Sequence, residues 1–167
     1  MKTILIMRHA EAASATAGMQ DYDRPLTDAG IRMAGTTAQL LQDADISPDL
    51  VIASAALRTT RTAMVLQAAL APQAPLICEQ ELYQAGAQGY AHRISSITDS
   101  QGSVALFVGH NPGLATLLCY WAQTVTSVPP CTLAVIDFET DNWQQLADCQ
   151  RSLRMLIRRG SRQDSTA

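Results

Sequence analysis

Guanidinium and imidazole side chains occur in this 167-residue chain at places where short apolar runs end. The run 4–7 leads directly into Arg8 and His9, and the run 104–108 is followed two residues later by His110. Continuous apolar runs of this length are typical of strands that are covered on both faces of a sheet. Ligands of an open parallel sheet bind outside the carboxyl ends of its strands. We therefore expect these side chains to meet at one edge of a sheet.

A third apolar run contributes a second arginine to the same edge. The run 50–53 leads into Ser54, and Arg58 lies in the opening turn of the helix expected next. The planar fork of an arginine matches the oxygen geometry of a phosphate, and helix N-termini at this edge add further N–H donors. A pocket with two guanidiniums and two imidazoles predicts an anionic ligand, and a phosphoryl group fits it best.

The elements that position these residues alternate between strands and helices. Apolar spacing and capping residues predict four helices, over about 28–41, 56–70, 90–98 and from Asn111 onward. Asn111 is expected to cap the last helix, with Pro112 at its first position. Residues 132–138 alternate polar and apolar side chains, and residues 143–146 are expected to pair with them as a hairpin. The pattern predicts a three-layer α/β/α sandwich with a mostly parallel central sheet and an antiparallel edge strand.

Composition and length restrict the class of protein. Apolar residues make up 47% of the chain and charged residues 16%, which is typical of one globular domain. The net charge is −3, so we expect no nucleic-acid partner. We expect the domain to cover residues 1–150. Residues 151–167 carry five arginines and one aspartate, and they are expected to form a basic C-terminal tail that is partly disordered or packed on the body.

Several other classes are not expected. No apolar run reaches the roughly 18 residues that a membrane-spanning helix needs, so we expect no membrane partner and a cytoplasmic location. The four cysteines form no C-x-x-C pair, which favours reduced thiols, and the three histidines show no metal-ligand spacing. We therefore expect no metal and no other cofactor. Nothing in the sequence demands more than a monomer.

Four segments together resemble a known family. The stretch 6–10 (IMRHA) is similar to the R-H-G signature of the histidine phosphatase superfamily, with alanine in place of the usual glycine. The stretch 54–63 (SAALRTTRTA) resembles the second motif of that family, and 109–112 (GHNP) resembles its last. The stretch 24–30 (RPLTDAG) is similar to the small SixA-type phosphohistidine phosphatases. This resemblance implies the phosphoglycerate-mutase-like fold.

The resemblance also implies roles for the residues in these motifs. His9 would attack phosphorus and become phosphorylated, and water would then release phosphate. Arg8 and Arg58 would lower the pKa of His9 and hold the phosphoryl oxygens in the transition state. His110 is expected to be a further clamp, and Arg24 is expected to be a contact from a loop that folds over the pocket.

The proton donor is less well defined by the resemblance. Many superfamily members use a glutamate from the middle of the chain, where this chain has Glu79 and Glu81, and Glu81 is our candidate. An imidazole leaving group needs no donor if its second nitrogen already carries a proton, whereas an alkoxide does. Ser54 and Asn111 are expected to be further contacts to the substrate.

The segment between Arg58 and His110 bears on the substrate. It has only 51 residues, whereas larger members of the superfamily carry insertions there that close over a small substrate. We therefore expect a metal-independent phosphatase that hydrolyses phosphohistidine on a phosphotransfer or signalling protein. One alternative is a phosphomonoesterase for a small metabolite, such as a sugar phosphate or a nucleotide precursor. Another is a non-catalytic module that binds phosphoproteins, and the two histidines could also be ordinary core residues.

Overall fold

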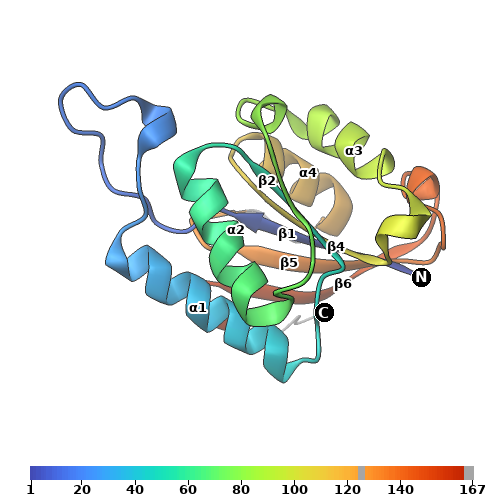
Figure 1. The fold of residues 1–167 in the computed structure, drawn as a ribbon. Coiled ribbons are helices and arrows are strands. Elements are labelled where there is room, and N and C mark those ends of the chain that lie inside the picture. Colours follow the sequence, from blue (N-terminus) through green and yellow to red (C-terminus); the bar gives the residue numbers. More distant parts are fainter. Residues whose placement is uncertain (124–126, 164–167) are drawn as a thin grey trace.

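A mixed β-sheet forms the centre of the molecule in a computed structural model that describes residues 1–123 and 127–163 (Figure 1). Within these residues the sheet has seven strands in the order β3-β2-β4-β1-β5-β6-β7. The strands are β1 Lys2–Arg8, β2 Leu50–Ser54, β3 Leu76–Glu79, β4 Val104–Gly109, β5 Leu133–Phe138, β6 Arg151–Arg158 and β7 Ser161–Gln163. The first four in chain order pair in parallel, and β5, β6 and β7 are antiparallel.

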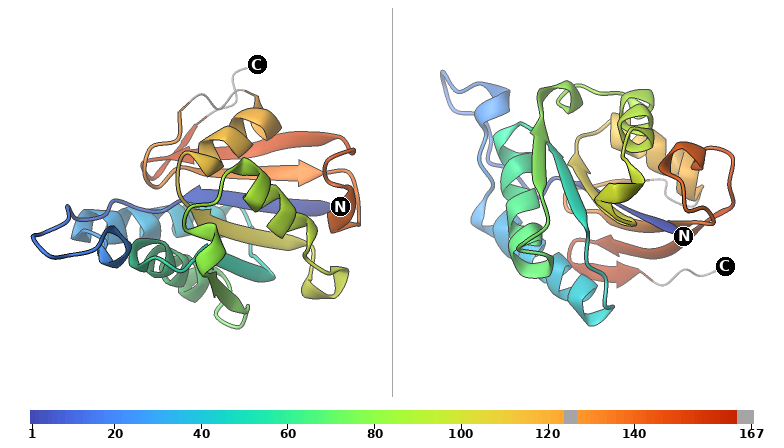
Figure 2. Two further views of the ribbon diagram at one scale, coloured as in Figure 1. Left: turned by 90° about the horizontal axis from the view of Figure 1, so that it is seen from above. Right: turned by 45° about the vertical axis from the view of Figure 1, so that its right-hand side comes forward.

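Helices cover both faces of this sheet (Figures 1 and 2). The α-helices of the described residues are α1 Asp28–Asp43, α2 Leu57–Leu70, α3 Ala87–Ser95 and α4 Gly113–Ala122, and the 3-10 helices are η1 Asp21–Asp23, η2 Gln80–Leu82, η3 Asp99–Gln101 and η4 Trp143–Gln145. One core cluster joins the sheet to α1 and α2, and the other joins it to α3 and α4. The predicted α/β/α sandwich is therefore confirmed. None of these helices is long and apolar enough to cross a membrane.

The continuous apolar runs are explained by this burial on two sides. Along β1, Ile4 and Ile6 belong to the cluster under α3 and α4, whereas Leu5 and Met7 belong to the cluster under α1 and α2. All four side chains are fully buried. Successive side chains of a strand point to opposite faces, so a strand with helices on both faces needs apolar residues at every position.

The C-terminal residues complete the sheet rather than forming a separate tail. Residues 151–158 are β6, which pairs with β5, and β7 follows it, so the domain extends past residue 150 and β5 is not an edge strand. The side chains of Met155 and Ile157 are buried, whereas Arg154 forms an ion pair with Asp137 on β5. The strand was not predicted because its arginines made the segment read as basic rather than as apolar. The expectation of a tail for residues 164–167 lies outside the described residues.

Two local predictions were wrong, and one short strand was not predicted. Helix α4 begins at Gly113 with Pro112 at the cap position, and the side chain of Asn111 does not cap it but donates to the backbone oxygen of Val128. Residues 143–146 form no hairpin strand, because Trp143 buries its ring and donates to the backbone oxygen of Gly102 at 3.1 Å. The short edge strand β3 was not predicted, because it has only four residues and none of them is buried.

Candidate active site

Four side chains that the sequence singled out meet at the carboxyl edge of the sheet. The strands β1 and β4 are paired so that Arg8 lies opposite Gly109, which brings His9 and His110 together with ring centroids 5.3 Å apart. Arg58, from the first turn of α2, lies against both rings: its Nε donates to Nε2 of His9 at 3.3 Å, and its Nη2 donates to Nδ1 of His110 at 3.4 Å. The predicted convergence of these groups is therefore present in the fold.

The hydrogen bonds of His9 define its protonation state. Its Nδ1 donates to the backbone oxygen of Ala10 at 2.7 Å, because a carbonyl oxygen can only accept. Burial lowers the pKa of His9 to about 4, helped by the charges of Arg58, Arg8 and Arg24 and opposed by the Ala10 carbonyl. The ring is therefore neutral near pH 7, with its proton on Nδ1 and a lone pair on Nε2.

His110 is neutral for a similar reason. Burial, followed by the charge of Arg58, lowers its pKa to about 3. Because its Nδ1 accepts from Arg58, its Nε2 carries the proton and donates to Oγ of Ser54 at 2.9 Å. Ser54 is fully buried behind the ring and does not line the cavity at this edge. The structure therefore places Ser54 where it orients His110, rather than where a substrate could reach it.

Arg8 and Asn111 share one backbone acceptor. Nη1 of Arg8 and Nδ2 of Asn111 both donate to the oxygen of Val128 at 2.9 Å. The Nε atom of Arg8 is buried and has no hydrogen-bond partner among residues 1–123 and 127–163. A buried N–H without an acceptor is costly, so this position suits an acceptor that a ligand supplies. An anion with several oxygens meets that requirement.

A cavity of about 410 Å³ opens over these groups. It is lined by Arg8, His9, Glu11, Ala12, Asp21, Arg24, Arg58, Tyr83, Gln84, His110, Asn111 and Pro130. The cavity therefore contains three guanidiniums and two neutral imidazoles. Such a lining is suited to a multiply charged oxyanion, and Nε2 of the neutral His9, which accepts from Arg58, carries a lone pair beside it.

Comparison with known proteins agrees with this geometry. The family model for the histidine phosphatase superfamily (branch 1) matches residues 4–86. The chain belongs to the histidine phosphatase superfamily. It is 27% identical to a protein of Agrobacterium tumefaciens whose structure is assigned as the phosphohistidine phosphatase SixA; that structure superposes with a TM-score of 0.80 over 94% of this chain and 97% of the other.

Two further relatives mark the range of this similarity. An uncharacterized protein of Mycobacterium tuberculosis is 33% identical over 111 residues, which are 66% of this chain and 66% of that protein. The alpha-ribazole phosphatase of Shigella flexneri shares the fold, with a TM-score of 0.64 at 20% identity over 94% of this chain and 96% of that one. The superfamily makes this protein a phosphatase, and its substrate is a separate question.

The glutamates considered as proton donors lie away from the phosphatase cavity. Glu81 is exposed on η2 and does not line the cavity, because that turn buries Leu82 and directs Tyr83 to the cavity instead. Glu79 forms an ion pair with Arg93 at 2.7 Å. Neither side chain is placed to protonate a leaving group in this conformation.

Two residues that the sequence reasoning did not select, Asp21 and Tyr83, line the same cavity. The Asp21 carboxylate accepts from Nη2 of Arg58 at 2.9 Å, from Nη1 of Arg24 at 2.8 Å and from the hydroxyl of Tyr83 at 2.7 Å. The bonds from Arg24 and Tyr83 are the main reason that the pKa of Asp21 lies well below its ordinary value, so the side chain is ionised. The position of Asp21, three residues before Arg24, was the only signal for it in the sequence.

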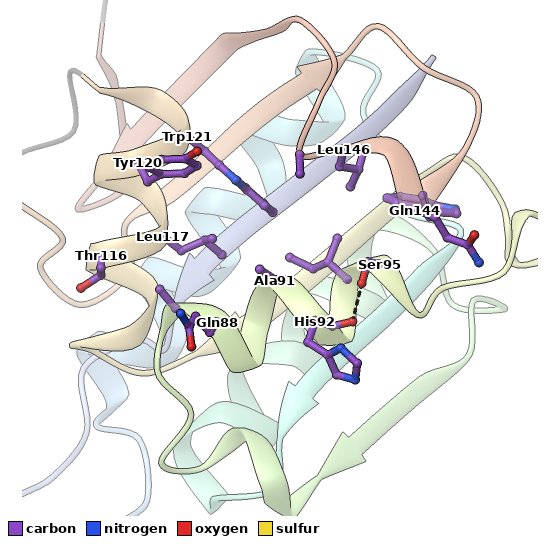
Figure 3. Close-up of a pocket in the computed structure, with 14 residues that line it drawn as sticks. Gln88, Ala91, His92, Ser95, Thr116, Leu117, Tyr120, Trp121, Gln144 and Leu146 are labelled. Atoms are coloured by element: carbon purple, nitrogen blue, oxygen red, sulfur yellow. Dashed lines mark hydrogen bonds between the residues drawn. The ribbon is translucent and has the colours of Figure 1, made fainter.

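A second cavity, of about 610 Å³, lies between α3, α4 and η4 (Figure 3). Its walls are largely apolar and include Leu117, Trp121 and Leu146. The one imidazole at its border is His92, whose backbone oxygen accepts from the hydroxyl of Ser95. Its lining residues include no arginine, so it does not suit a phosphoryl group. Among the described residues, no group of three or more His, Cys, Asp or Glu side chains is placed to hold a metal ion.

Proposed function

We propose that this phosphatase hydrolyses phosphohistidine carried on a phosphotransfer or signalling protein, through a phosphorylated His9. The proposal rests on one observation: a neutral His9 lies within an arginine-lined cavity, with its proton fixed on Nδ1 by Ala10 and with its Nε2 lone pair accepting only from Nε of Arg58, a donor that a phosphoryl oxygen can take over. A histidine in this tautomer is ready to attack phosphorus without first losing a proton.

In the first step the Nε2 lone pair of His9 forms a bond to phosphorus as the bond from phosphorus to the substrate nitrogen breaks. The electron pair of the broken bond returns to the substrate imidazole, which leaves as a neutral ring if its other nitrogen carries a proton. Arg8 and Arg58 hold the phosphoryl oxygens while the charge redistributes. His110, held by Ser54 and Arg58, borders the same oxygens.

In the second step a water oxygen attacks the phosphorus on His9. The bond from phosphorus to Nε2 breaks and its electrons return to Nε2, while the proton of the water passes to a phosphate oxygen or to solvent. Because Nδ1 keeps its proton throughout, His9 leaves as a neutral imidazole and is ready for another cycle. Neither step requires a metal ion in this scheme.

The arrangement of carboxyl groups supports a nitrogen leaving group. Glu81 lies outside the cavity, and hydrogen bonds from Arg24 and Tyr83 lower the pKa of Asp21 and keep it ionised. Glu11 lines the cavity and accepts the hydroxyl of Thr27 at 2.8 Å. An alkoxide would need a proton from a carboxylic acid, whereas a protonated imidazole ring leaves without one. The similarity to the structure assigned as SixA, over nearly the whole chain, points to the same substrate class.

A small-metabolite phosphomonoesterase is the second candidate. The cavity volume of about 410 Å³ can accept a small phosphate ester, and the same fold occurs in an alpha-ribazole phosphatase. A non-catalytic module that binds phosphoproteins would use the same arginines without turnover. These functions differ in what they hydrolyse, so a substrate comparison separates them.

The deciding experiment compares kcat/KM for a protein phosphorylated on histidine with kcat/KM for a panel of sugar phosphates and nucleotides. We expect the phosphohistidine protein to be preferred and the enzyme to carry an acid-labile label at His9 during turnover. A higher kcat/KM for one of the metabolites would replace the leading proposal with the second candidate. Phosphate binding with no turnover of any substrate would identify a binding module. Treatment with a chelator should leave the rate unchanged.

A further inference from the structure

The carboxylate of Asp21 occupies donors that a phosphoryl group would need. All three nitrogen atoms of Arg58 already have an acceptor: Nε reaches His9, Nη1 reaches the backbone oxygen of Asp21 at 2.5 Å, and Nη2 reaches the carboxylate of Asp21. Nη1 of Arg24 also donates a hydrogen bond to this carboxylate. Two of the three guanidiniums in the cavity therefore each donate one nitrogen to the same internal carboxylate.

The two partners of the central ion pair differ in how firmly they are held. Arg58 lies on helix α2, and only 7% of its side chain is exposed. It donates to the rings of His9 and His110, and its guanidinium lies 5.9 Å from the ring centre of Tyr83. The side chain of Asp21 is 54% exposed. Arg58 therefore keeps its place without Asp21, and Asp21 is the partner that can move.

The segment that carries Asp21 projects beyond the body of the domain (Figures 1 and 2). Its base is closed by a bridge between Ala12 and Leu26, and its outer part includes Gly18, which has a φ of +83° that suits glycine. Residues 14–18 are exposed to solvent. A turn carried on such a loop can shift without disturbing the core.

We propose that Asp21 is an internal competitor for the phosphoryl site: its carboxylate holds Arg58 and Arg24 while the site is empty and gives them up when a phosphoryl group binds. This inference rests on the proposed phosphoryl site but not on the identity of the leaving group. The carboxylate of Asp21 must release the two arginines before any anion can bind. Asp21 therefore lowers the affinity of the site for every anion by the same factor. Weakly bound anions then fail to occupy the site, and tightly bound phosphoryl groups succeed.

A positioning role for Asp21 predicts the opposite result. If the carboxylate were needed to orient Arg58, its removal would weaken the binding of a phosphoryl group. If instead Asp21 acted only as a nearby negative charge, removal of that charge would strengthen the binding of a doubly charged ligand more than the binding of a singly charged one. Competition alone predicts an equal gain for both ligands.

The test measures the binding of two ligands of matched shape by calorimetry, at a pH where phenylphosphonate carries two charges and benzenesulfonate carries one. The Asp21→Asn variant removes the competing charge at nearly constant size. The control is Asp23→Asn, which removes an equal charge from the same turn η1. Neither ligand can be hydrolysed, so the readout is independent of catalysis. Circular dichroism and thermal unfolding confirm that each variant is folded.

We expect Asp21→Asn to raise the affinity for both ligands by about tenfold, because the ligand no longer has to displace one charge-assisted contact within the protein. We expect Asp23→Asn to change the two affinities little. Weaker binding in Asp21→Asn, a gain no larger than that of Asp23→Asn, or a gain limited to the phosphonate would overturn the proposal. If only the variant binds, competition is strong and the proposal stands. If neither protein binds either ligand, the phosphoryl site itself is absent, and both this inference and the proposed function fail.

Discussion

The Nε atom of Arg58 donates a hydrogen bond to Nε2 of His9 over 3.3 Å, although 49 positions separate the two residues in the chain. In this bond the lone pair of a neutral imidazole faces a guanidinium, a group whose geometry suits phosphoryl oxygens. Burial is a larger cause of the low pKa of His9 than the charge of Arg58. Arg58 therefore mainly fixes the orientation of the His9 ring, and burial within the fold keeps that ring neutral.

Replacement of His9 tests the nucleophile directly. We expect His9→Ala to reduce hydrolysis of an aryl phosphate by about a thousandfold or more, because the covalent route is lost. The control is His92→Ala, which removes an imidazole from the border of the apolar cavity and should leave the rate unchanged. Turnover by His9→Ala at the rate of the unaltered protein would end the covalent mechanism.

The buried histidines make stability depend on pH. The pKa of His9 is lowered from 6.5 to about 4, and that of His110 to about 3, whereas both have ordinary values in the unfolded chain. As the pH falls, the unfolded state therefore takes up protons first. The free energy of unfolding should be constant above about pH 6.5 and should fall between there and pH 4, by on the order of 3 kcal/mol for His9.

Urea denaturation at a series of pH values across this window measures the effect. The double variant His9→Gln and His110→Gln removes both titrating rings, so its free energy of unfolding should decline less over the same range. An equally steep decline in the double variant would show that other groups control the acid sensitivity.

Ser54 is expected to act through His110. Ser54→Ala removes the group that accepts the Nε2 proton of His110, so the His110 ring is no longer held in one orientation. We expect kcat to fall by about tenfold and the free energy of unfolding to fall by about 1 kcal/mol. Ser54→Thr keeps the hydroxyl and should restore much of the rate if the added methyl group is accommodated. A drop in stability without any change in kcat would assign Ser54 a purely structural role.

Gly30 allows α1 to approach the segment that follows His9. A Cβ at this position would lie 2.2 Å from the backbone oxygen of Glu11, so Gly30→Ala should destabilise the fold by about 1–3 kcal/mol. Gly35 lies on the same helix with nothing within 4 Å of its Cβ position, and Gly35→Ala should stabilise the protein by up to about 1 kcal/mol. Thermal unfolding of the two variants should therefore shift in opposite directions.

Some parts of the fold depend on information that lies close together in the chain. The run 4–7 has apolar residues at every position, which marks a strand covered on both faces. The side chain of Thr27 accepts from the backbone nitrogen of Gly30 at 2.9 Å, as its position before the first helix predicts. Strand β6 was missed because its arginines dominate its local pattern, and its pairing with β5 connects distant residues.

The sequence by itself determined that Arg8, His9, Arg58 and His110 would gather at one edge, because parallel strands all end on the same side of a sheet. Only the tertiary structure decided that Asp21 and Tyr83 join them, that Ser54 lies behind His110, and that Glu81 stays outside. A continuous apolar run is a local pattern that predicts a strand buried in a parallel sheet. The path of a loop and the direction of a single side chain depend instead on packing between segments far apart in the chain.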